Sequence, residues 1–536
     1  MRRIAGIAAL LTGVALSRIS AQHAPAWVHG ATCYEVFVRS FYDSDGDGIG
    51  DLNGLTAKLD YINDGNRRSE RSLGARCVWL MPIVESPSYH GYDATDYYHV
   101  ARAYGTNEDF KRFVAAAHRR GIRVLVDMVL NHTSNEHPWF QAAMRDTASP
   151  YRKWYRWSPT KPDAKGPWGQ EVWYKSPVRD EYYYAVFWSG MPDLNYETTA
   201  VRTEVKKIAR FWLREMGVDG FRLDAVPFLM EDGGKLAGSP GTHALLREYA
   251  AYVRSVRSDA YTVGEVYDSL GTVLTYYPDQ LDSYFAFELA DSIVAAVRNG
   301  RGRGMLAPAL RLQRAVPNDR TSPFLRNHDQ PRTRTELGGD MRKARLASFL
   351  LLTMPGLPFV YYGEEIGMVG AKPDERLRTP MQWTAGHAGG FTTGTPWESL
   401  QDDSSSITVE AEAADSSSVL AMNRRMIHLR SRIAALGDGA LVPLRASHDG
   451  VTAYLRRSAS SIVLVVANLT SETLEGVTLS AEGAAVPAGR WAVRSLIDKT
   501  SAPRLTVGAG GRFAAYSPVR ALAPLEGYVF ALSRLP

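Results

Sequence analysis

The chain has 536 residues, of which 45% are hydrophobic and 22% charged, and its formal net charge is +5. This length exceeds what one hydrophobic core usually organises, so we expect a large domain with smaller attachments. Lysines and arginines are interspersed with acidic residues instead of forming a basic stripe, which argues against a nucleic-acid partner.

The first 21 residues have the pattern of a signal peptide. Arg2 and Arg3 precede an apolar stretch from Ile4 to Leu16, and small residues follow as far as Ala21. No later stretch approaches the about 18 uninterrupted apolar residues that a membrane-spanning helix needs. We therefore expect cleavage near Ala21, a secreted or periplasmic protein and no stable membrane insertion. A membrane-tethering helix is the alternative.

The cysteines are Cys33 and Cys77, and each begins an apolar segment that we assign to neighbouring strands. Export permits a disulfide between them. Two buried free thiols are at least as good an interpretation of the residues, and metal binding by two lone cysteines is not expected.

Apolar, β-branched segments alternate with amphipathic helices, which is typical of parallel βα units. The capping pair Thr106 and Asp109 begins one such helix and Gly121 ends it. The pattern predicts an α/β protein built on a (β/α)₈ TIM barrel. The expected strands are residues 33–41, 77–83, 122–130, 220–226, 261–267, 283–289, 322–327 and 358–363.

Two segments interrupt or follow the barrel. Residues 133–196, after the third strand, are rich in Trp, Tyr, Pro and Gly and form a loop-rich inserted domain. Loops after barrel strands lie on the catalytic face, so this insertion would build one wall of a substrate cleft. The barrel then comprises residues 22–132 and 197–440, and the short alternating strands of residues 441–536 predict an antiparallel β-sandwich.

Four acidic segments end candidate strands: DMVLNH at 127–132, GFRLDAV at 220–226, GEV at 264–266 and NHD at 327–329. Hydrolysis of a glycoside with retention needs two carboxyl groups about 5 Å apart, one attacking and one protonating the leaving oxygen. Asp224 and Glu265 end adjacent strands and are the pair that we choose. Arg222 points to the same side of its strand as Asp224, where its cation would keep that carboxylate ionised, as a nucleophile requires.

In this order, the four segments and MPDLN at 191–195 closely resemble the motifs of glycoside hydrolase family 13, the alpha-amylase family, over nearly all of the chain after the signal peptide. The resemblance implies that Asp224 is the nucleophile and Glu265 the general acid/base. It implies that Asp329, beside His328, is a third catalytic carboxylate that grips sugar hydroxyls. Asp127 would give structural support, and His132 would hydrogen-bond the sugar.

Two further motifs resemble substrate-binding elements of this family. SYHGYD contains His90 and Tyr92, which resemble residues that hydrogen-bond and stack on the sugar at the cleavage point. Asp93, with Arg378 in RTPMQW, resembles a pair that closes the non-reducing end of the cleft in exo-acting relatives. If the pair forms, we expect a pocket and short substrates; otherwise the cleft is open.

The segment DSDGDGIGD at 43–51 gathers carboxylates that repel one another unless a hard cation neutralises them, and oxygen ligands at this spacing suit Ca²⁺. An EF-hand would need Glu where the chain has Gly54. The same loop occurs in the oligoglucosidase-like branch of the family, where it binds structural calcium or sometimes magnesium. A metal-free acidic turn is the alternative, and no organic cofactor is expected. The expected ligands are Asp43, Asp45, Asp47, the Ile49 carbonyl and Asp51.

The resemblance also bears on the substrate. In this branch Val after the nucleophile accompanies α-1,6 specificity, whereas smaller residues accompany α-1,4 specificity, and here the residue is Ala225. MPDLN, with Met191, resembles the intermediate group between oligo-1,6-glucosidases and neopullulanases. We therefore expect a monomer that hydrolyses α-1,4 bonds of an α-glucan or of maltooligosaccharides.

Other activities remain open at this point. DAVPFL at 224–229 is similar to trehalose synthases, which share the glycosyl-enzyme intermediate, and oligo-1,6-glucosidase activity is a further alternative. A remote one is a non-catalytic relative such as the heavy subunits of amino-acid transporters, although those carry a membrane helix and have generally lost complete catalytic sets.

Overall fold

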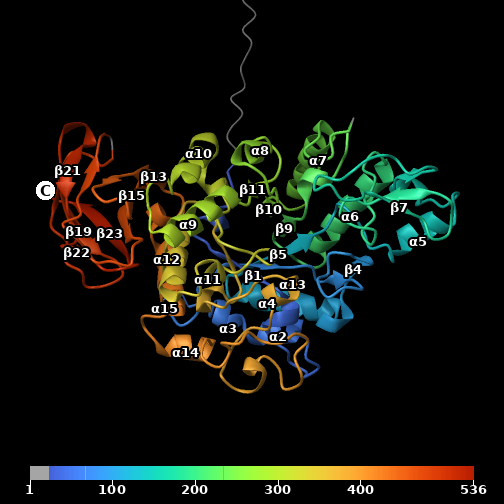
Figure 1. Cartoon of the computed structure of the whole chain (residues 1–536), viewed down its shortest axis with the longest axis horizontal. Coiled ribbons are helices and arrows are strands. Elements are labelled where there is room, and N and C mark those ends of the chain that lie inside the picture. Colours follow the sequence, from blue (N-terminus) through green and yellow to red (C-terminus); the bar gives the residue numbers. More distant parts are fainter. Residues whose placement is uncertain (1–22, 67, 233, 484) are drawn as a thin grey trace, which may run out of the picture.

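The computed structural model describes residues 23–66, 68–232, 234–483 and 485–536 (Figure 1). The expected signal peptide, residues 1–21, lies outside the described residues. Among the helices that are described, none combines the length and the apolar character needed to cross a membrane.

A curled parallel sheet forms the centre of the molecule, as the sequence predicts. Its seven strands follow the order β11-β10-β9-β5-β2-β1-β12, and each neighbouring pair is parallel. The strands are β1 Cys33–Val36, β2 Cys77–Leu80, β5 Arg123–Met128, β9 Gly220–Leu223, β10 Tyr261–Gly264, β11 Ser283–Tyr284 and β12 Phe359–Tyr361.

The seventh expected strand, residues 322–327, is present only as a short connection that closes the ring. Ser322 bridges Phe285 in parallel, and the Phe359 N–H donates to the Pro323 carbonyl at 2.9 Å. Because Pro323 has no N–H to donate, a regular ladder cannot run through this position. The barrel therefore closes through carbonyls of the segment.

All the expected barrel strands are shorter in the structure, and in two of them a helix replaces the expected end of the strand. The chain turns into α1, Val38–Phe41, directly after β1, and into α9, Phe287–Asn299, shortly after β11. These strands thus end sooner than expected, and the residues after them form loops and helices at the carboxyl ends of the barrel strands.

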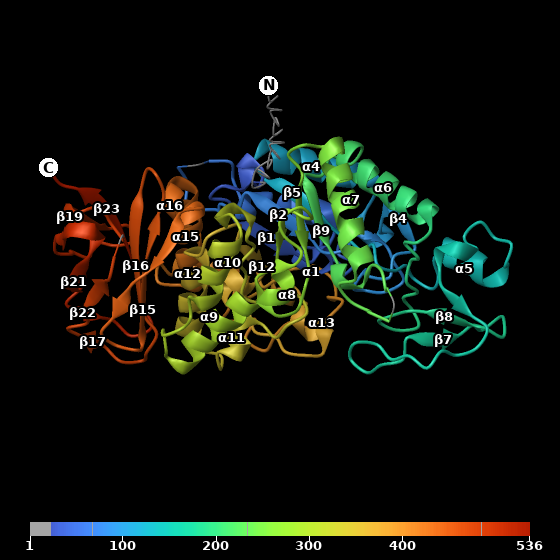
Figure 2. The same ribbon diagram turned by 90° about the horizontal axis from the view of Figure 1, so that it is seen from above.

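Amphipathic helices surround the sheet (Figures 1 and 2). The capping box of Thr106 and Asp109 is confirmed at the start of α4, Asn107–Arg119, and α6, Thr199–Arg214, buries Val201, Val205 and Trp212 against the barrel. The other helices of this part are α2 Leu52–Ala57, α3 Leu59–Ile62, α7 Pro240–Val256, α8 Leu270–Leu274, α10 Ala307–Ala315, α11 Thr333–Glu336, α12 Met341–Leu352, α13 Asp374–Leu377, α14 Val409–Ala414, α15 Val419–Arg432 and α16 Ala434–Gly437, and a small hairpin joins β3 Val84–Glu85 to β4 Asp96–Val100.

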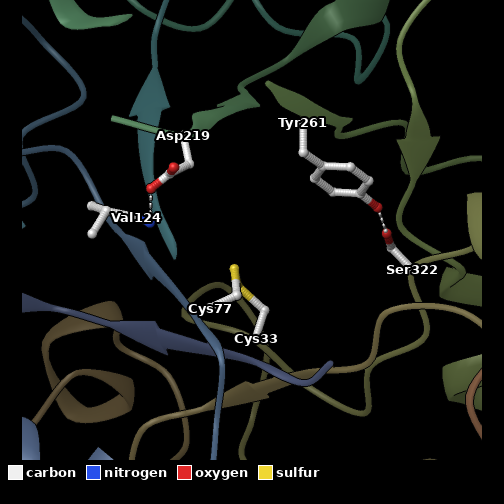
Figure 3. The surroundings of a disulfide bond; sticks show 6 residues. All are labelled: Cys33, Cys77, Val124, Asp219, Tyr261 and Ser322. Carbon is white, nitrogen blue, oxygen red and sulfur yellow. Dashed lines mark hydrogen bonds between the residues drawn. A yellow bond between two sulfur atoms is a disulfide. The ribbon is translucent and has the colours of Figure 1, made fainter. Parts of the chain in front are cut away.

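At the start of the barrel strands, Cys33 and Cys77 are register partners on β1 and β2 and form a disulfide (Figure 3). Of the two interpretations left open by the sequence, the structure has the disulfide. Nearby, the buried Asp219 carboxylate accepts the Val124 N–H at 2.8 Å. This end of the barrel is therefore tied together by covalent and polar links, on the face opposite the strand ends that carry the acidic motifs.

The insertion after β5 projects from the barrel at the right of Figures 1 and 2. It contains α5 Pro138–Arg145 and an antiparallel sheet of β6 Trp157–Ser158, β8 Tyr182–Tyr184 and β7 Trp173–Lys175.

The C-terminal region is antiparallel and has its own apolar core, as predicted. Its larger sheet contains β13 Ala440–Pro443, β15 Val451–Arg457, β16 Ile462–Asn468, β23 Gly527–Arg534, β19 Gly489–Ser495 and β20 Leu505–Val507. Facing strands are β14 Arg445–Ala446, β18 Leu479–Ala481 and β21 Phe513–Tyr516, with the pair β17 Leu474–Glu475 and β22 Ala521–Leu522.

Candidate active site

Arg222, on β9, is the centre of a charge network at the carboxyl ends of the strands. Its Nη1 donates to both oxygens of Asp127, at 2.9 and 3.0 Å, and to Asp224 Oδ1 at 2.7 Å. Its Nη2 lies 2.8 Å from Glu265 Oε2. The Arg222 side chain is 1% exposed, so one buried cation balances three carboxyl groups from neighbouring strands.

Burial raises the pKa of Glu265 to about 6; Arg222 opposes this shift, and the charges of Asp224 and Asp329 reinforce it. Burial also raises the pKa of Asp224, again with Arg222 in opposition. Arg222 contacts both carboxyl groups, so it does not by itself distinguish a nucleophile from an acid, contrary to the argument from sequence. The raised pKa of Glu265 gives it a proton to donate near pH 6.

His328 joins a second group of charges beside the first. Its Nδ1 lies 2.6 Å from Glu35 Oε1, and its Nε2 lies 2.6 Å from the Tyr92 hydroxyl and 3.2 Å from Asp329 Oδ2. Burial opposes the charged imidazolium, but Asp329 and Glu35 raise the pKa of His328 to about 10. Arg378 Nη2 donates to Asp329 at 2.8 Å. Burial opposes ionisation of Asp329, yet these two cations hold its pKa well below the usual range.

Glu35 is a site residue that sequence reasoning missed. It lies inside β1 and is 1% exposed, so it belongs to a strand that the sequence pattern assigns to the core. Its only readable signal is a charge within an otherwise apolar segment, which demands a buried partner.

His132, His90 and Tyr92 line the same cavity. His132 Nε2 lies 3.1 Å from the Tyr92 carbonyl, and burial lowers the pKa of His132 to about 4, so this ring is neutral and donates through Nε2. The rings of His90 and Tyr92 stack with centroids 6.1 Å apart. The Tyr92 hydroxyl lies 3.2 Å from Asp127 Oδ2, which connects the tyrosine to the Arg222 network.

The expected pairing of Asp93 with Arg378 does not form in the part of the chain that the structure describes. Asp93 Oδ1 accepts hydrogen bonds from Ser86 at 2.6 Å and from Ser88. Arg378 pairs instead with Asp329 and, at 3.5 Å, with Asp374. Asp329 is the nearer anion, so the guanidinium is held at the Asp329 carboxylate.

The MPDLN motif joins the insertion to the end of β5. Asp193 accepts hydrogen bonds from Asn131 Nδ2 at 3.1 Å and from the Val186 N–H at 2.9 Å, and it bridges His132 through the backbone. The Leu194 N–H donates to the Asn131 carbonyl at 2.9 Å. The motif therefore holds the insertion beside the His132 ring.

A cavity of about 1390 Å³ opens over these residues. Among the predicted residues, its lining includes His90, Tyr92, His132, Asp224, Glu265, Asp329 and Arg378. Asp127, Arg222 and His328 lie beneath it in the two charge networks. This volume exceeds the about 300–1,000 Å³ of typical small-ligand pockets.

Much of the cavity wall was not identified from sequence. The insertion contributes aromatic rings, as the Trp-rich composition suggested, but which rings face the cavity depends on tertiary packing. From the insertion, the wall contains Trp168, Phe187 and Trp188. The other wall residues that were not predicted are Phe228, Lys235, His243, Arg247, Tyr267 and Tyr276. A smaller hollow of about 600 Å³ shares Glu265, Tyr267 and Asp329 with the main cavity.

Ala225, directly after Asp224, has a left-handed backbone conformation with φ 46° and ψ 34°. Its N–H donates to Glu265 Oε2 at 3.3 Å. A residue with a β-carbon is strained in this conformation, so the turn that presents Asp224 is held in place by its surroundings.

Away from these residues in the sequence, Asp43, Asp45 and Asp51 form the acidic cluster of the 43–51 loop. One carboxylate oxygen of each lies within 4.8 Å of the others. Asp47 lies outside this group, and its Oδ1 accepts the Ile49 N–H at 2.7 Å.

The cluster fits a hard divalent cation. A backbone hydrogen bond from Asp47 opposes protonation of Asp45, but burial and the neighbouring carboxylates of Asp47, Asp43 and Asp51 raise its pKa. A cation would relieve that repulsion. Both Asp43 oxygens and Asp51 Oδ1 accept two hydrogen bonds each. Asp51 Oδ2 and Asp45 Oδ1 accept one N–H each, from Ser44 and Asp47, and therefore retain a lone pair that a metal could use.

A barrel that brings three carboxyl groups, two histidines and a buried arginine to one aromatic-walled cavity at its strand ends defines a carbohydrate-cleaving enzyme of the glycosidase class. Residues 35–439 match the family model described as alpha amylase, catalytic domain. The chain belongs to the alpha-amylase family of glycoside hydrolases and transglycosidases.

Individual relatives agree with this family. The chain is 41% identical to alpha-amylase 3 of Dictyoglomus thermophilum over 448 residues, which cover 83% of this chain and 85% of the relative. It is 36% identical to a trehalose synthase/amylase of Mycolicibacterium smegmatis over 80% of each chain. The solved structure of an alpha-amylase from H. orenii is 38% identical and superposes with a TM-score of 0.82, covering 94% of this chain and 100% of that one.

Proposed function

We propose that the protein hydrolyses α-1,4-glucosidic bonds of α-glucans or maltooligosaccharides with retention of configuration. The observation that carries this proposal is the placement of Asp224 and Glu265 on the two terminal nitrogens of one buried guanidinium, in one cavity. Two carboxyl groups on one cation are close enough to act on the same glycosidic bond.

In the first step, an Asp224 oxygen attacks carbon one of the sugar while Glu265 gives its proton to the leaving oxygen, and the bond between that carbon and oxygen breaks. In the second step, ionised Glu265 takes a proton from water as the water oxygen attacks the same carbon and releases Asp224. Asp329, kept ionised by His328 and Arg378, accepts hydrogen bonds from sugar hydroxyl groups and favours the positive charge that develops on the ring.

Preference for the α-1,4 bond is supported by Ala225 in the cavity wall after the nucleophile, because the resemblance associates Val there with α-1,6 bonds. The alpha-amylase relative at 41% identity supports the same substrate. We infer that the chain lies in the intermediate group characterised by MPDLN.

The second candidate function is isomerisation of a disaccharide, as in a trehalose synthase. It is favoured by the relative at 36% identity and by DAVPFL at 224–229. Hydrolysis and isomerisation share the Asp224 intermediate and differ only in whether water or retained glucose attacks it. Oligo-1,6-glucosidase activity is the remaining alternative, whereas family membership and a complete set of carboxylates argue against a non-catalytic relative.

Product analysis after incubation with maltose, maltoheptaose, isomaltose and soluble starch tests the proposal. Short maltooligosaccharides from starch are expected; trehalose from maltose would establish the isomerase, and glucose from isomaltose the α-1,6 enzyme. Glu265→Gln should abolish turnover and leave sugar binding intact, and unchanged activity in this variant would refute the assigned role.

We further propose that Asp43, Asp45 and Asp51 hold a structural Ca²⁺, with Asp47 and the Ile49 carbonyl as additional ligands and Mg²⁺ as the other candidate. When bound, the ion would neutralise the loop. We also propose export to the periplasm or medium, supported by the leader-like first 21 residues and by the Cys33–Cys77 disulfide, which persists in oxidising compartments.

A further inference from the structure

Four large hydrophobic side chains are exposed in the part of the chain that the structure describes: Trp168 at 63%, Val178 at 51%, Trp188 at 51% and Tyr267 at 72%. Exposed rings forgo the free energy that burial would provide. Three of the four line the active-site cavity, and only Val178 does not. Their exposure is thus concentrated where a ligand can cover them.

Trp168 is held by a tight turn in the insertion. The Gly169 N–H donates to the Gly166 carbonyl at 2.9 Å, and the Trp168 N–H donates to the Gln170 side chain at 2.9 Å. Gln170 in turn donates from Nε2 to the Val186 carbonyl at 2.7 Å. These bonds fix the backbone on both sides of the indole.

Trp188 is held by a close approach to Gly190. A β-carbon at position 190 would lie 2.2 Å from the Trp188 ring, so the indole covers this glycine. The Met191 N–H donates to the Trp188 carbonyl at 2.9 Å and closes the turn. Glycine at 190 is therefore required by the position of the ring.

Contacts between rings connect the His132 ring to the Trp168 indole. Phe187 contacts His132 with centroids 5.4 Å apart, and Trp168 contacts Phe187 at 5.7 Å and Phe228 at 5.4 Å. Trp168 thus lies one ring beyond the ring that touches His132. A sugar stacked on Trp168 would therefore be separated from the His132 ring by the Phe187 ring.

The direction in which a bound glucan would extend is inferred from the residues that surround the carboxyl groups. Arg378, bound to Asp329 and close to Asp374, occupies one side of the catalytic residues. Most other lining residues come from the insertion, from residues 225–247 and from the segment after Glu265. Under the proposed function Glu265 protonates the leaving oxygen, and the segment after it, from Val266 to Tyr276, lines the cavity, so the leaving group is expected in this larger part.

We propose that Trp168 and Trp188 form a remote subsite, in which their indole faces stack on glucosyl units of the leaving-group part of a linear α-1,4-glucan. This inference rests on the proposed function and adds to it a preference for maltooligosaccharides longer than a disaccharide. The C–H face of glucose is apolar enough to pack on an indole, and the ring edges keep their hydroxyl groups in water.

The test compares Trp168→Ala and Trp188→Ala with the matched control Val178→Ala, which removes an exposed apolar side chain of the same insertion outside the cavity. Dissociation constants for maltoheptaose and maltose are measured by calorimetry in the Glu265→Gln background. The ratio of kcat/KM for maltoheptaose to kcat/KM for maltose is measured in the active enzyme. Gly190→Ala displaces the Trp188 ring but keeps both indoles, so it serves if Trp188→Ala fails to fold.

Each Trp→Ala change is expected to weaken maltoheptaose binding by about two- to tenfold, with a smaller effect on maltose and a lower kcat/KM ratio. Gly190→Ala should reproduce part of the Trp188→Ala effect, and Val178→Ala should bind both sugars as the unaltered protein does. Equal weakening for both sugars, or no weakening for either, would overturn the subsite. Failure of the proposed function is seen separately, as trehalose formed from maltose by the unaltered enzyme, because the binding comparison does not depend on the products.

Discussion

Removing the charge of Arg222 should shift the whole pH profile of the enzyme upward. Arg222→Met keeps a long side chain but no cation, whereas the matched variant Arg222→Lys keeps the charge and loses the planar fork. Without the guanidinium, ionisation of Glu265 and Asp224 becomes less favourable, so both pKa values rise. Glu265 then stays protonated to higher pH, and Asp224 becomes ionised only at higher pH.

The magnitude follows from the contacts. Two unit charges 4 Å apart interact by about 4 kcal/mol at an effective dielectric constant of about 20, which corresponds to about three pKa units. Glu265 is 19% exposed, so water screens part of this interaction. We expect the alkaline limb of Arg222→Met to move upward by about one to two pH units, and that of Arg222→Lys to move less.

The same change should destabilise the fold. The side chain of Asp127 is completely buried and depends on Arg222 for its compensating charge. Breaking one side of such a buried pair costs about 3–5 kcal/mol. Thermal unfolding measures this loss of stability. The acidic and alkaline limbs of the pH profile are measured as kcat/KM for maltoheptaose between pH 4.5 and 9. If Arg222→Met lowered activity but left both limbs in place, the electrostatic account of the site would be refuted.

Four other outcomes are expected. In the unaltered enzyme kcat/KM should fall about tenfold per pH unit above about pH 6, because the acid Glu265 loses its proton; a flat profile to pH 8 would contradict this. Replacing Cys33 and Cys77 by Ser should cost about 4 kcal/mol in unfolding free energy for a sequence separation of 44 residues, and an unaltered melting temperature would argue against the disulfide. EDTA should lower the melting temperature and Ca²⁺ restore it, with a weaker response in Asp45→Asn; indifference to EDTA would exclude the structural ion. Ala225→Val should destabilise by about 1–3 kcal/mol and Ala225→Gly should not, because of the positive φ; equal stability of the two variants would show that this backbone is unstrained.

The fold was predictable where local patterns determine it. The capping pair at Thr106 and Asp109 locates the start of α4, and β-branched runs locate the barrel strands. The exceptions arise where apolar character continues past the strand. Residues 38–41 read as a continuation of β1 but form α1, because sequence hydrophobicity does not distinguish a buried strand from a buried helical turn.

The site was predictable to the extent that its residues lie in motifs. The motifs bring Asp224, Glu265 and Asp329 to one cavity. The wall was not predictable, since which side chains of the insertion face inward depends on how Asp193 attaches it to β5. Glu35 was missed because its partner His328 is distant in sequence and is brought to it only by closure of the barrel.

The distinction between the two catalytic carboxyl groups comes from access rather than from Arg222. Both form ion pairs with that guanidinium at nearly equal distances, 2.7 Å for Asp224 and 2.8 Å for Glu265, and carboxyls so coupled titrate as a pair. Asp224 lines only the main cavity, whereas Glu265 lines both this cavity and the adjoining hollow. The acid/base must meet the leaving group in one step and water in the next, and a nucleophile needs only the sugar. Of the two, only Glu265 also lines the adjoining hollow, which Asp329 lines as well. We propose that water reaches Glu265 through this hollow after the leaving group departs, consistent with its proposed role as acid/base.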